Sequence, residues 1–558
     1  MISRLGGWSL PEPSRSIRPT RLGDGIAALA RISAALALVA ALLTAIPSPA
    51  PAAAAGPPWI LHAKRYPGGL SQGVRAYALH PTLASAGPSV SGPSSAAPSP
   101  AQGTLDNIRM TTNPVPQNET AVAFDLSDPM KAVAAANGYV NDSLWIGRTV
   151  DGGQTWSGRF KVPHVRHTGE RCSASDPSVV YSTRDAAFYI STLCFTTGAI
   201  SEIDVWKSVD DGAHWTSSGR AARVISNQRT NGSVNRSIFF DKELLAVDNF
   251  PASPYYGRLY ATYVKFHMQP GGFSDTCPAQ VAYTDHISTA NPTAATWHHV
   301  GVNAPRPRSH GKGPSANQWV TPVVDSHHGL DLAYVLESCN SGADTGLFFK
   351  RSTNGGRTFG PRVKINKPGE WADDPNKGDL LPHKNARIGL SPSLAFDSQN
   401  EVLDYVFEND VNRATSGADI SYARSTDFGA HWSHTVTLSV NKKGNPARKD
   451  QFFPAITSDG QGVLHAIWFD NRRDPNDVWI DTWQADSVDG GLTWTSEDIS
   501  SASWDPNRSF SQCGCFIGDY NGIASSPTMT YPVWTDGRNT PGPPNGDTEI
   551  YSNPEPAP

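Results

Sequence analysis

The stretch Ser487-Val-Asp-Gly-Gly-Leu-Thr-Trp494 decides the fold of this chain, because close copies of it recur at four other places. Every copy has Asp or Asn at the third position, Gly at the fifth and an aromatic residue at the eighth. The polar side chain can accept backbone N–H groups and close a tight turn, and Gly supplies the positive φ that such turns need. The other copies are Thr149-Val-Asp-Gly-Gly-Gln-Thr-Trp156, Ser208-Val-Asp-Asp-Gly-Ala-His-Trp215, Ser352-Thr-Asn-Gly-Gly-Arg-Thr-Phe359 and Ser425-Thr-Asp-Phe-Gly-Ala-His-Trp432.

Short runs of strand-forming residues precede these turns, such as residues 144–146, 204–206, 347–349 and 420–422. Each turn is therefore predicted to join two antiparallel strands as a β-hairpin, with its aromatic residue packing under the sheet.

The five turns resemble the Asp-box, the bacterial neuraminidase repeat of sialidases and of many other β-propellers. The resemblance covers residues 106–552 and is to secreted sialidase-like proteins with Asp-box repeats. It implies an all-β propeller whose boxes lie on the outer rim of the blades, away from a central pocket. The box residues are therefore expected to be structural.

A second element recurs seven times: a polar start followed by a short apolar strand. The seventh unit has only three strands, and residues 107–111 can supply the fourth and close the ring without a free edge. The sequence therefore predicts seven blades, with six as the alternative because sialidases have six. The seven elements begin at Asn118, Asp176, Lys242, Trp319, Ser391, Gln451 and Asp519.

The N-terminal 55 residues combine scattered arginines, an apolar run over 32–46 and then small residues, the order of a secretory signal peptide. We expect cleavage near residues 53–55; an uncleaved membrane anchor is the alternative, although the apolar run is short for a span. Residues 56–105 are expected to be a linker rich in Pro, Ser and Ala. The propeller is assigned to 106–558, and the mature protein is expected to be extracellular, monomeric and free of the membrane.

Charge and cysteines narrow the function further. The formal net charge is -5 and no basic stripe exists, so nucleic acid is not an expected partner. Six cysteines in an exported chain permit disulfides. Cys172 and Cys194 lie on one repeat and Cys277 and Cys339 on neighbouring repeats, whereas Cys513 and Cys515 would need a strained ring.

The starts of the seven inner strands should converge on one mouth of the central channel, which makes a candidate site. The resemblance to sialidases implies Tyr520 as nucleophile, with Glu119 or Glu243 as its base, an acid/base Asp at Asp176 or Asp519, and an arginine clamp. The polar residues at these starts are Asn118, Glu119, Asp176, Asp241, Lys242, Glu243, Gln318, Arg387, Asp450, Gln451, Asp519 and Tyr520.

The clamp is assigned to Arg387, Arg473 and Arg538, with Asp470 and Asp536 beside the last two. An Asp with an Arg two or three residues later can form a bidentate contact with the guanidinium, and a structural salt bridge between blades is the alternative. The Arg-Ile-Pro signature of sialidases is missing; residues 387–389 read Arg-Ile-Gly instead.

Two functions stay open at this point. One is a glycoside hydrolase that acts on exposed sugars at the central mouth, and the other is a non-catalytic propeller that binds glycan or protein. A carbohydrate or glycoconjugate is the expected partner in the first. No cofactor or metal site is assigned, but Asp-Pro-Asn strings at 374–376, 474–476 and 505–507 leave Ca²⁺ open.

Overall fold

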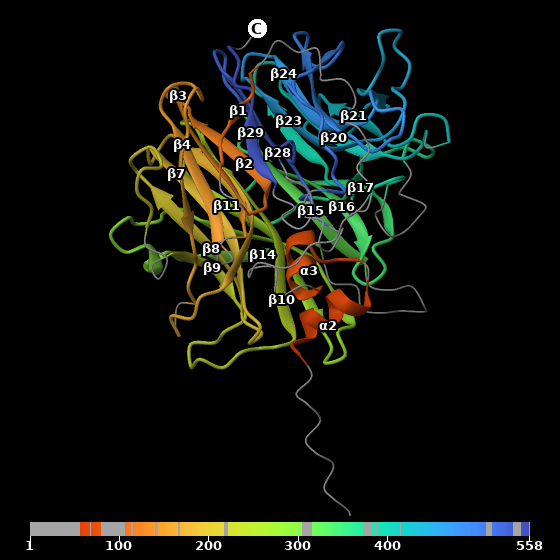
Figure 1. Ribbon diagram of the computed structural model, residues 1–558. Helices are drawn as coiled ribbons and strands as arrows, with labels where there is room; N and C mark the ends of the chain where they lie inside the picture. Colours follow the sequence, from red (N-terminus) through yellow and green to blue (C-terminus); the bar gives the residue numbers. More distant parts are fainter. Residues whose placement is uncertain are drawn as a thin grey trace, which may run out of the picture. The chain divides into compact units, whose positions relative to one another are not determined.

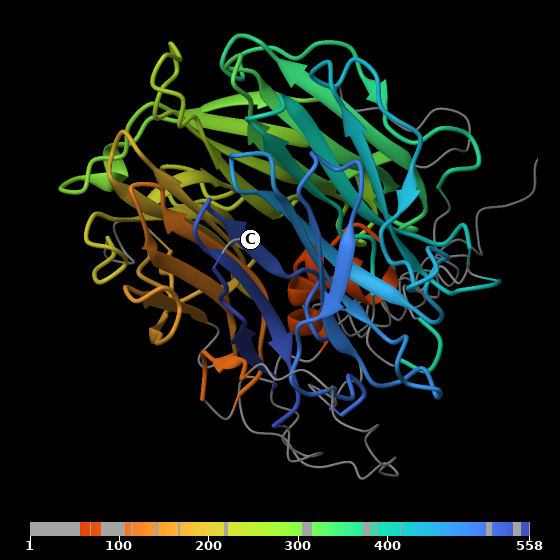
Figure 2. The same cartoon turned by 90° about the horizontal axis from the view of Figure 1, so that it is seen from above.

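The computed structural model describes residues 56–66, 68–79, 106–112, 115–139, 143–165, 168–216, 221–303, 315–371, 381–384, 388–412, 414–508, 516–539 and 548–556; of residues 72, 76 and 315–317 it describes the backbone alone. Their strands form seven small antiparallel sheets that follow one another around an axis as a seven-bladed β-propeller (Figures 1 and 2). The first strand of each sheet contacts the first strand of the next, so the first strands surround the axis. The fold class predicted from the turns is confirmed.

The strands of each blade follow one another from the axis outward. Blade 1 consists of β2 (Gln117–Asp125), β3 (Asp128–Gly138), β4 (Ser143–Thr149) and β5 (Ser157–Lys161), and blade 2 of β6 (Ser173–Ser182), β7 (Ala187–Phe195), β8 (Ser201–Ser208) and β9 (Ala222–Ser226). Blade 3 consists of β10 (Ile238–Val247), β11 (Leu259–Met268), β13 (Ala279–Thr284) and β14 (His298–Gly301). In blade 3 the short strand β12 (Ser274–Thr276) also pairs with β11, and the 3-10 helix η2 (Pro292–Ala294) precedes β14. Blade 4 is β15 (Ser315–Val324), β16 (Leu330–Ser338), β17 (Asp344–Ser352) and β18 (Val363–Lys364); blade 5 is β19 (Ser393–Asp397), β20 (Val402–Asn409), β21 (Asp419–Ser425) and β22 (Val436–Thr437); blade 6 is β23 (Gln451–Ser458), β24 (Leu464–Asp470), β25 (Asp481–Ser487) and β26 (Thr495–Asp498); blade 7 is β27 (Gly522–Ser525), β28 (Thr530–Asp536), β29 (Glu549–Ser552) and β1 (Ile108–Arg109).

The two ends of the propeller sequence meet in blade 7. Strand β1 pairs antiparallel with β29, so the start of the chain supplies the outermost strand of the last sheet. This confirms the predicted closure, and the six-bladed alternative is wrong.

The box at 487–494 has the predicted hairpin geometry between β25 and β26. Ser487 Oγ accepts the N–H of Gly491 at 2.8 Å and donates to Asp489 Oδ1 at 2.8 Å. Asp489 Oδ1 also accepts the N–H of Thr493 at 2.8 Å. The other four boxes repeat these bonds with their own residues.

The fifth box position is Gly in all five copies because the turn approaches the preceding blade. At Gly491 the backbone has φ +82°, and an added Cβ would lie 1.9 Å from Tyr422 Oη on blade 5. At Gly429 the same atom would lie 1.9 Å from the Phe349 ring on blade 4. Both the positive φ and the lack of space therefore exclude a side chain.

The hydrophobic core consists of layers between neighbouring blades. Between blades 1 and 2, for example, the buried Trp206 packs with Val133, Ile146 and Ile190. Burial of such large aromatic and aliphatic groups is the main stabilising contribution to the ring.

In the described part of the chain, the helices α2 (Pro58–Arg65) and α3 (Gln72–Leu79) precede the propeller, and their buried residues join the core layer between blades 2 and 3. Figures 1 and 2 show both helices (red) near the centre of the ring. The expected linker is therefore helical over these residues, because Trp59, Leu70 and Val74 find apolar surface on the blades. The expected signal peptide and residues 80–105 lie outside the described residues.

The structure contains the expected disulfides and settles two pairings that the sequence left open. Cys172 bonds to Cys194 within blade 2, and Cys277 of blade 3 bonds to Cys339 of blade 4. Cys513 and Cys515 lie outside the described residues. Within the described part of the chain, no helix has the length and apolarity needed to cross a membrane.

Candidate functional site

The inner strands of five blades share a β-bulge at the same height. In each, the pairing with the second strand shifts register, as between Asn118 and Ala121 of β2. A bulge re-aims a side chain, and a positive φ at a non-Gly residue is uncommon. The residues with positive φ at these bulges are Glu119 (57°), Asp176 (57°), Lys242 (54°), Trp319 (52°) and Phe453 (54°).

The two remaining blades place Ser391 and Tyr520 at the equivalent position. Each stands two residues before the first paired residue of its inner strand, the offset that Glu119 has from Ala121. Every blade therefore has one residue at this position of its inner strand.

Lys242 is the centre of this ring of residues. Its Nζ lies 2.6 Å from Asp519 Oδ2, 3.1 Å from Asp176 Oδ2 and 3.8 Å from Glu119 Oε1. It also lies 4.0 Å from the centre of the Trp319 ring and 5.3 Å from that of Tyr520. Residues of blades 1, 2, 3, 4 and 7 thus meet at one ammonium group; we call Glu119, Asp176, Lys242, Trp319, Asp519 and Tyr520 the axial cluster.

A polar residue of the second strand of blade 1 contacts two residues of the axial cluster, the Glu119 carboxylate and the Asp176 backbone. Asn137 Nδ2 donates to Glu119 Oε2 and, at 3.1 Å, to Asn118 Oδ1. Its Oδ1 accepts the N–H of Asp176 at 2.9 Å. The amide therefore couples the bulges of blades 1 and 2.

Burial favours the protonated form of several acids here. Burial, followed by the nearby Asp176, raises the pKa of Glu119 well above its ordinary value, although Lys242 opposes the shift. The same two causes raise the pKa of Asp241 to about 8. Burial and Asp176 also raise the pKa of Glu243 well above its ordinary value. The site can therefore hold protons at neutral pH.

The same burial and the same carboxylates also shift the pKa values of Lys242 and Tyr520. Burial opposes the charge of Lys242, but Asp176, Asp519 and Glu119 outweigh it and raise the lysine pKa. Burial and the neighbouring carboxylates raise the pKa of Tyr520 well above its ordinary value. The Tyr520 hydroxyl donates to the Pro177 carbonyl oxygen at 3.1 Å, so it is a neutral hydrogen-bond donor in this structure.

Four of the residues predicted for catalysis come together, namely Glu119, Asp176, Asp519 and Tyr520. Of the residues that sequence patterns did not single out, Trp319 and Asn137 are the most important. Trp319 is one of five residues with positive φ at the inner bulges, but in the sequence it marked only the start of a strand, and Gln318 was taken as the polar residue there. The central position of Lys242 could not be anticipated from its place among twelve polar starts.

Of the residues predicted to bind substrate, the four that the structure describes form ion pairs at blades 6 and 7. Asp470 accepts from the Trp468 indole at 2.9 Å and pairs with Arg472 at 2.6 Å. Asp536 repeats this arrangement in the next blade, with Trp534 at 3.0 Å and Arg538 at 2.6 Å.

These two loops therefore follow one structural pattern at the ends of β24 and β28. Arg473 faces Asp498 at 2.7 Å and Asp481 at 3.5 Å, both in blade 6. Arg538 Nη1 also donates to Ser501 Oγ at 2.7 Å. Arg387 lies outside the described residues. The structure thus brings Arg473 and Arg538 to blades 6 and 7, into ion pairs of their own.

The mouth above the axial cluster retains a cavity of about 30 Å³, which is room for about two water molecules. Lys242, Trp319 and Asp519 line it from the ring, and Glu337 and Asp344 line it from blade 4. The turn between α2 and α3 covers it through Gly69, Leu70 and Ser71.

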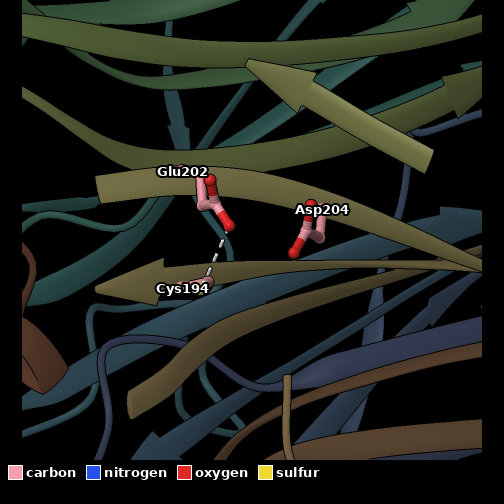
Figure 3. Close-up of side chains that lie close together, drawn as sticks. All are labelled: Cys194, Glu202 and Asp204. Carbon is pink, nitrogen blue, oxygen red and sulfur yellow. Dashed lines mark hydrogen bonds between the residues drawn. The ribbon is translucent and has the colours of Figure 1, made fainter. Parts of the chain in front are cut away.

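Among the described residues, Cys194, Glu202 and Asp204 form a group spaced closely enough to hold a metal ion (Figure 3). Cys194 is bonded to Cys172, so it has no thiolate to offer, and Arg223 pairs with Glu202 at 2.9 Å. The group therefore fits a structural role. Of the Asp-Pro-Asn strings, Asp474 and Asp505 accept backbone N–H groups of their own turns.

Solved structures of carbohydrate-active proteins match this chain with low sequence identity and low TM-scores. A Hadza microbial sialidase matches with 12% identity and a TM-score of 0.40, over 76% of this chain and 73% of its own. A GH93 α-L-arabinofuranosidase of Fusarium graminearum, in complex with arabinobiose, matches with 12% identity and a TM-score of 0.40, over 81% of this chain and 96% of its own. A PL25 ulvan lyase matches with 12% identity and a TM-score of 0.37, over 68% and 79%.

No protein-family profile matches the sequence, and a search of the curated proteins finds no match. The function must therefore be argued from the site itself.

Proposed function

We propose that the protein is a secreted, sialidase-like glycoside hydrolase that cleaves exposed sugars at the axial cluster with carboxylic acids. The observation that carries the proposal is the convergence of Glu119, Asp176 and Asp519 from three blades on Lys242. Most glycoside hydrolases use one protonated carboxyl group and one carboxylate beside the anomeric carbon. This site supplies both kinds of group.

The roles follow from the surroundings of each acid. Glu119 is the proposed proton donor, because burial raises its pKa and keeps a proton on it near neutral pH. Asp519 and Asp176, which face the Lys242 ammonium at 2.6 Å and 3.1 Å, are the proposed carboxylates that stabilise or attack the sugar cation.

Tyr520 is given a binding role in this proposal, not that of the nucleophile that the sialidase resemblance implies. Its hydroxyl donates to a backbone carbonyl, and its raised pKa disfavours the phenolate. Among the axial residues that the structure describes, Lys242 is the cation and it already faces three acids. This charge balance favours neutral sugars over sugars that carry a carboxylate. The two disulfides support an extracellular location.

The test is release of aryl alcohol from a panel of aryl glycosides by the purified protein, with neutral sugars and a sialoside in the panel. We expect turnover of a neutral glycoside, and a loss of at least about 100-fold in kcat for Glu119→Gln, because general acid catalysis contributes that much. Tyr520→Phe should keep most of kcat. Asp489→Asn, at an exposed rim turn, is the matched control and should behave as the unaltered protein.

Loss of turnover in Tyr520→Phe with a folded protein would contradict the carboxylate mechanism and restore the phenol as nucleophile. Turnover of the sialoside alone would contradict the preference for neutral sugars.

A non-catalytic binding propeller is the second candidate, and one observation favours it. Lys242 already fills the centre of the ring, and the free space beside it is about 30 Å³. Absence of turnover on every sugar, together with retention on a glycan array that Trp319→Ala abolishes, would establish this candidate instead.

A further inference from the structure

The two N-terminal helices are an addition to a ring that is already complete. Blade 7 closes through β1 and β29, so every strand of the seven blades lies in residues 108–552. Residues 56–79, which we call the N-terminal hairpin, nevertheless pack on β6 and β11. Closure of the propeller therefore does not explain why this segment is there.

The hairpin is anchored beside the mouth by two buried residues. Trp59 is 2% exposed and stacks on Phe239, with ring centres 5.3 Å apart. His62 is fully buried, and its two ring nitrogens lie 2.7 Å from the Gly272 carbonyl oxygen and 3.0 Å from that of Gly68. These contacts hold α2 against the loop of blade 3.

The turn between the helices reaches the acids of the mouth through its backbone. Gly69 N–H donates to Glu337 Oε1 at 2.8 Å, and Ser71 N–H donates to Asp241 Oδ2 at 2.6 Å. Leu70 lies between them, 3% exposed, and lines the cavity together with Lys242 and Trp319. Two peptide N–H donors thus occupy carboxylates that a hydroxyl-rich ligand would need.

Three glycines of the hairpin make this approach close. An added Cβ would lie 1.9 Å from Gly342 N at Gly68, 2.5 Å from Cys339 O at Gly69, and 2.4 Å from Ser175 Oγ at Gly73. Gly69 also has φ +91°, which only glycine adopts readily. At these three positions the hairpin therefore lies too close to the blades for any side chain larger than that of glycine.

The hairpin brings no acidic side chain to the acids of the mouth. Residues 25–105 contain no Asp or Glu. Arg65 and Arg75 of the hairpin donate to the backbone carbonyl oxygens of Gly271 and Tyr66. The mouth beneath it is lined by acids, among them Asp241, Glu337 and Asp519.

We propose that the N-terminal hairpin is an intramolecular plug, which occupies the axial mouth and must move away before a ligand can reach Lys242 and Asp519. The proposal rests on the proposed function insofar as the excluded ligand is a sugar. A plug lowers apparent affinity by the fraction of molecules in which it is open. Loosening it should therefore lower KM and leave kcat nearly unchanged.

The test uses the full chain with Gly69→Val. The valine side chain would clash with the Cys339 carbonyl oxygen, and valine does not readily adopt the positive φ of this position. The matched control is Gly444→Val, where φ is +79° and no atom lies within 4 Å of an added Cβ. We expect hydrogen exchange of the amides of residues 69–79 to rise about tenfold in Gly69→Val, and KM for a turned-over glycoside to fall by a similar factor. The control should change neither value.

A readout without substrate separates this proposal from the hydrolase proposal. A fluorescent peptide of residues 56–80 should bind the Gly69→Val protein, whose mouth is free, and should not bind the unaltered protein. Trp59→Ala provides a second loosened variant if Gly69→Val does not fold. Peptide binding without turnover of any sugar would support the plug and refute the hydrolase.

Two outcomes would overturn the plug. One is faster exchange in the hairpin with KM unchanged or with activity lost in a folded protein, which would make the hairpin part of the working site. The other is that the peptide binds neither the unaltered protein nor the Gly69→Val protein, and that hydrogen exchange of the hairpin is the same in Gly69→Val and Trp59→Ala as in the unaltered protein.

Discussion

The rim and the axis of this propeller use the same side chain in opposite ways. At the rim, hydrogen bonds from Thr493 lower the pKa of the exposed Asp489 to about 2. At the axis, burial and the nearby Asp176 raise the pKa of Asp241 to about 8. The rim carboxylate is charged and closes a turn, whereas the axial one holds a proton. The comparison teaches that the same carboxyl group is charged where it closes an exposed turn and protonated where it is buried among other acids.

The largest difference between the regions should appear when a lysine is removed. Lys242→Met leaves the axial carboxylates buried without their cation, and we expect a loss of about 3–5 kcal/mol in the free energy of unfolding. Urea unfolding near neutral pH measures it. Lys131→Met is the control, because Lys131 pairs with Asp211 at 3.2 Å on an open surface and should change stability little. Equal losses in both variants would remove the contrast between axis and rim.

The rim has one position that should be nearly as sensitive, which sharpens the comparison. Gly491→Ala combines a positive φ with a clash against Tyr422, and we expect a loss of about 2–4 kcal/mol. Gly490→Asp should be tolerated, since Asp211 and Phe428 occupy that box position with φ 55°. Thermal unfolding of the two variants side by side is the measurement, and similar losses would show that the contact with the preceding blade is unimportant.

Stability should depend on pH through the axis. An unfolded Asp titrates near about 3.9, so between that pH and about 8 the unfolded state loses a proton that folded Asp241 keeps. Stability therefore falls as pH rises, by up to about 1.4 kcal/mol per pH unit for this group. Asp241→Asn should remove that part of the slope between about pH 5 and 7. Unfolding curves with the same slope in both proteins would contradict the buried, protonated Asp241.

The smallest effect is expected at the rim turn. Asp489→Asn should leave stability nearly unchanged near neutral pH, because Asn354 fills the same position in another box. There its Oδ1 accepts the Thr358 N–H at 2.9 Å and its Nδ2 donates to Thr358 Oγ1 at 2.8 Å. Thermal unfolding checks this, and a loss larger than that of Gly491→Ala would mean that the charge, and not the hydrogen bonds, holds the turn.

Prediction from the sequence succeeded where the interactions are local. The box hydrogen bonds join residues two to four positions apart, so eight consecutive residues are enough to predict each turn. It was incomplete where contacts are long-range. Glu119, Asp176 and Asp519 were predicted to share a mouth, but Lys242 and Asp519 are 277 positions apart and nothing local announces their ion pair.

The arginines show the same limit from the other side. An Asp followed by an Arg was compatible with a substrate clamp or with a structural salt bridge, because the sequence pattern is the same for both. Only the structure places Arg538 on Asp536 and Arg473 on Asp498. The helical hairpin was predicted as linker because its short apolar segments are stable only against the blades.

The sequence by itself determined the propeller fold and the turns that join its strands, and it predicted seven blades and the closure of the ring while six blades stayed open as the alternative. It did so because each repeat is a local unit whose turn chemistry and strand pattern are contiguous in the chain. Only the tertiary structure decided which polar residues meet at the axis, which of their acids hold protons and that residues 56–79 cover them. Those outcomes depend on burial and on charges brought together from distant blades, and neither exists until the ring has closed.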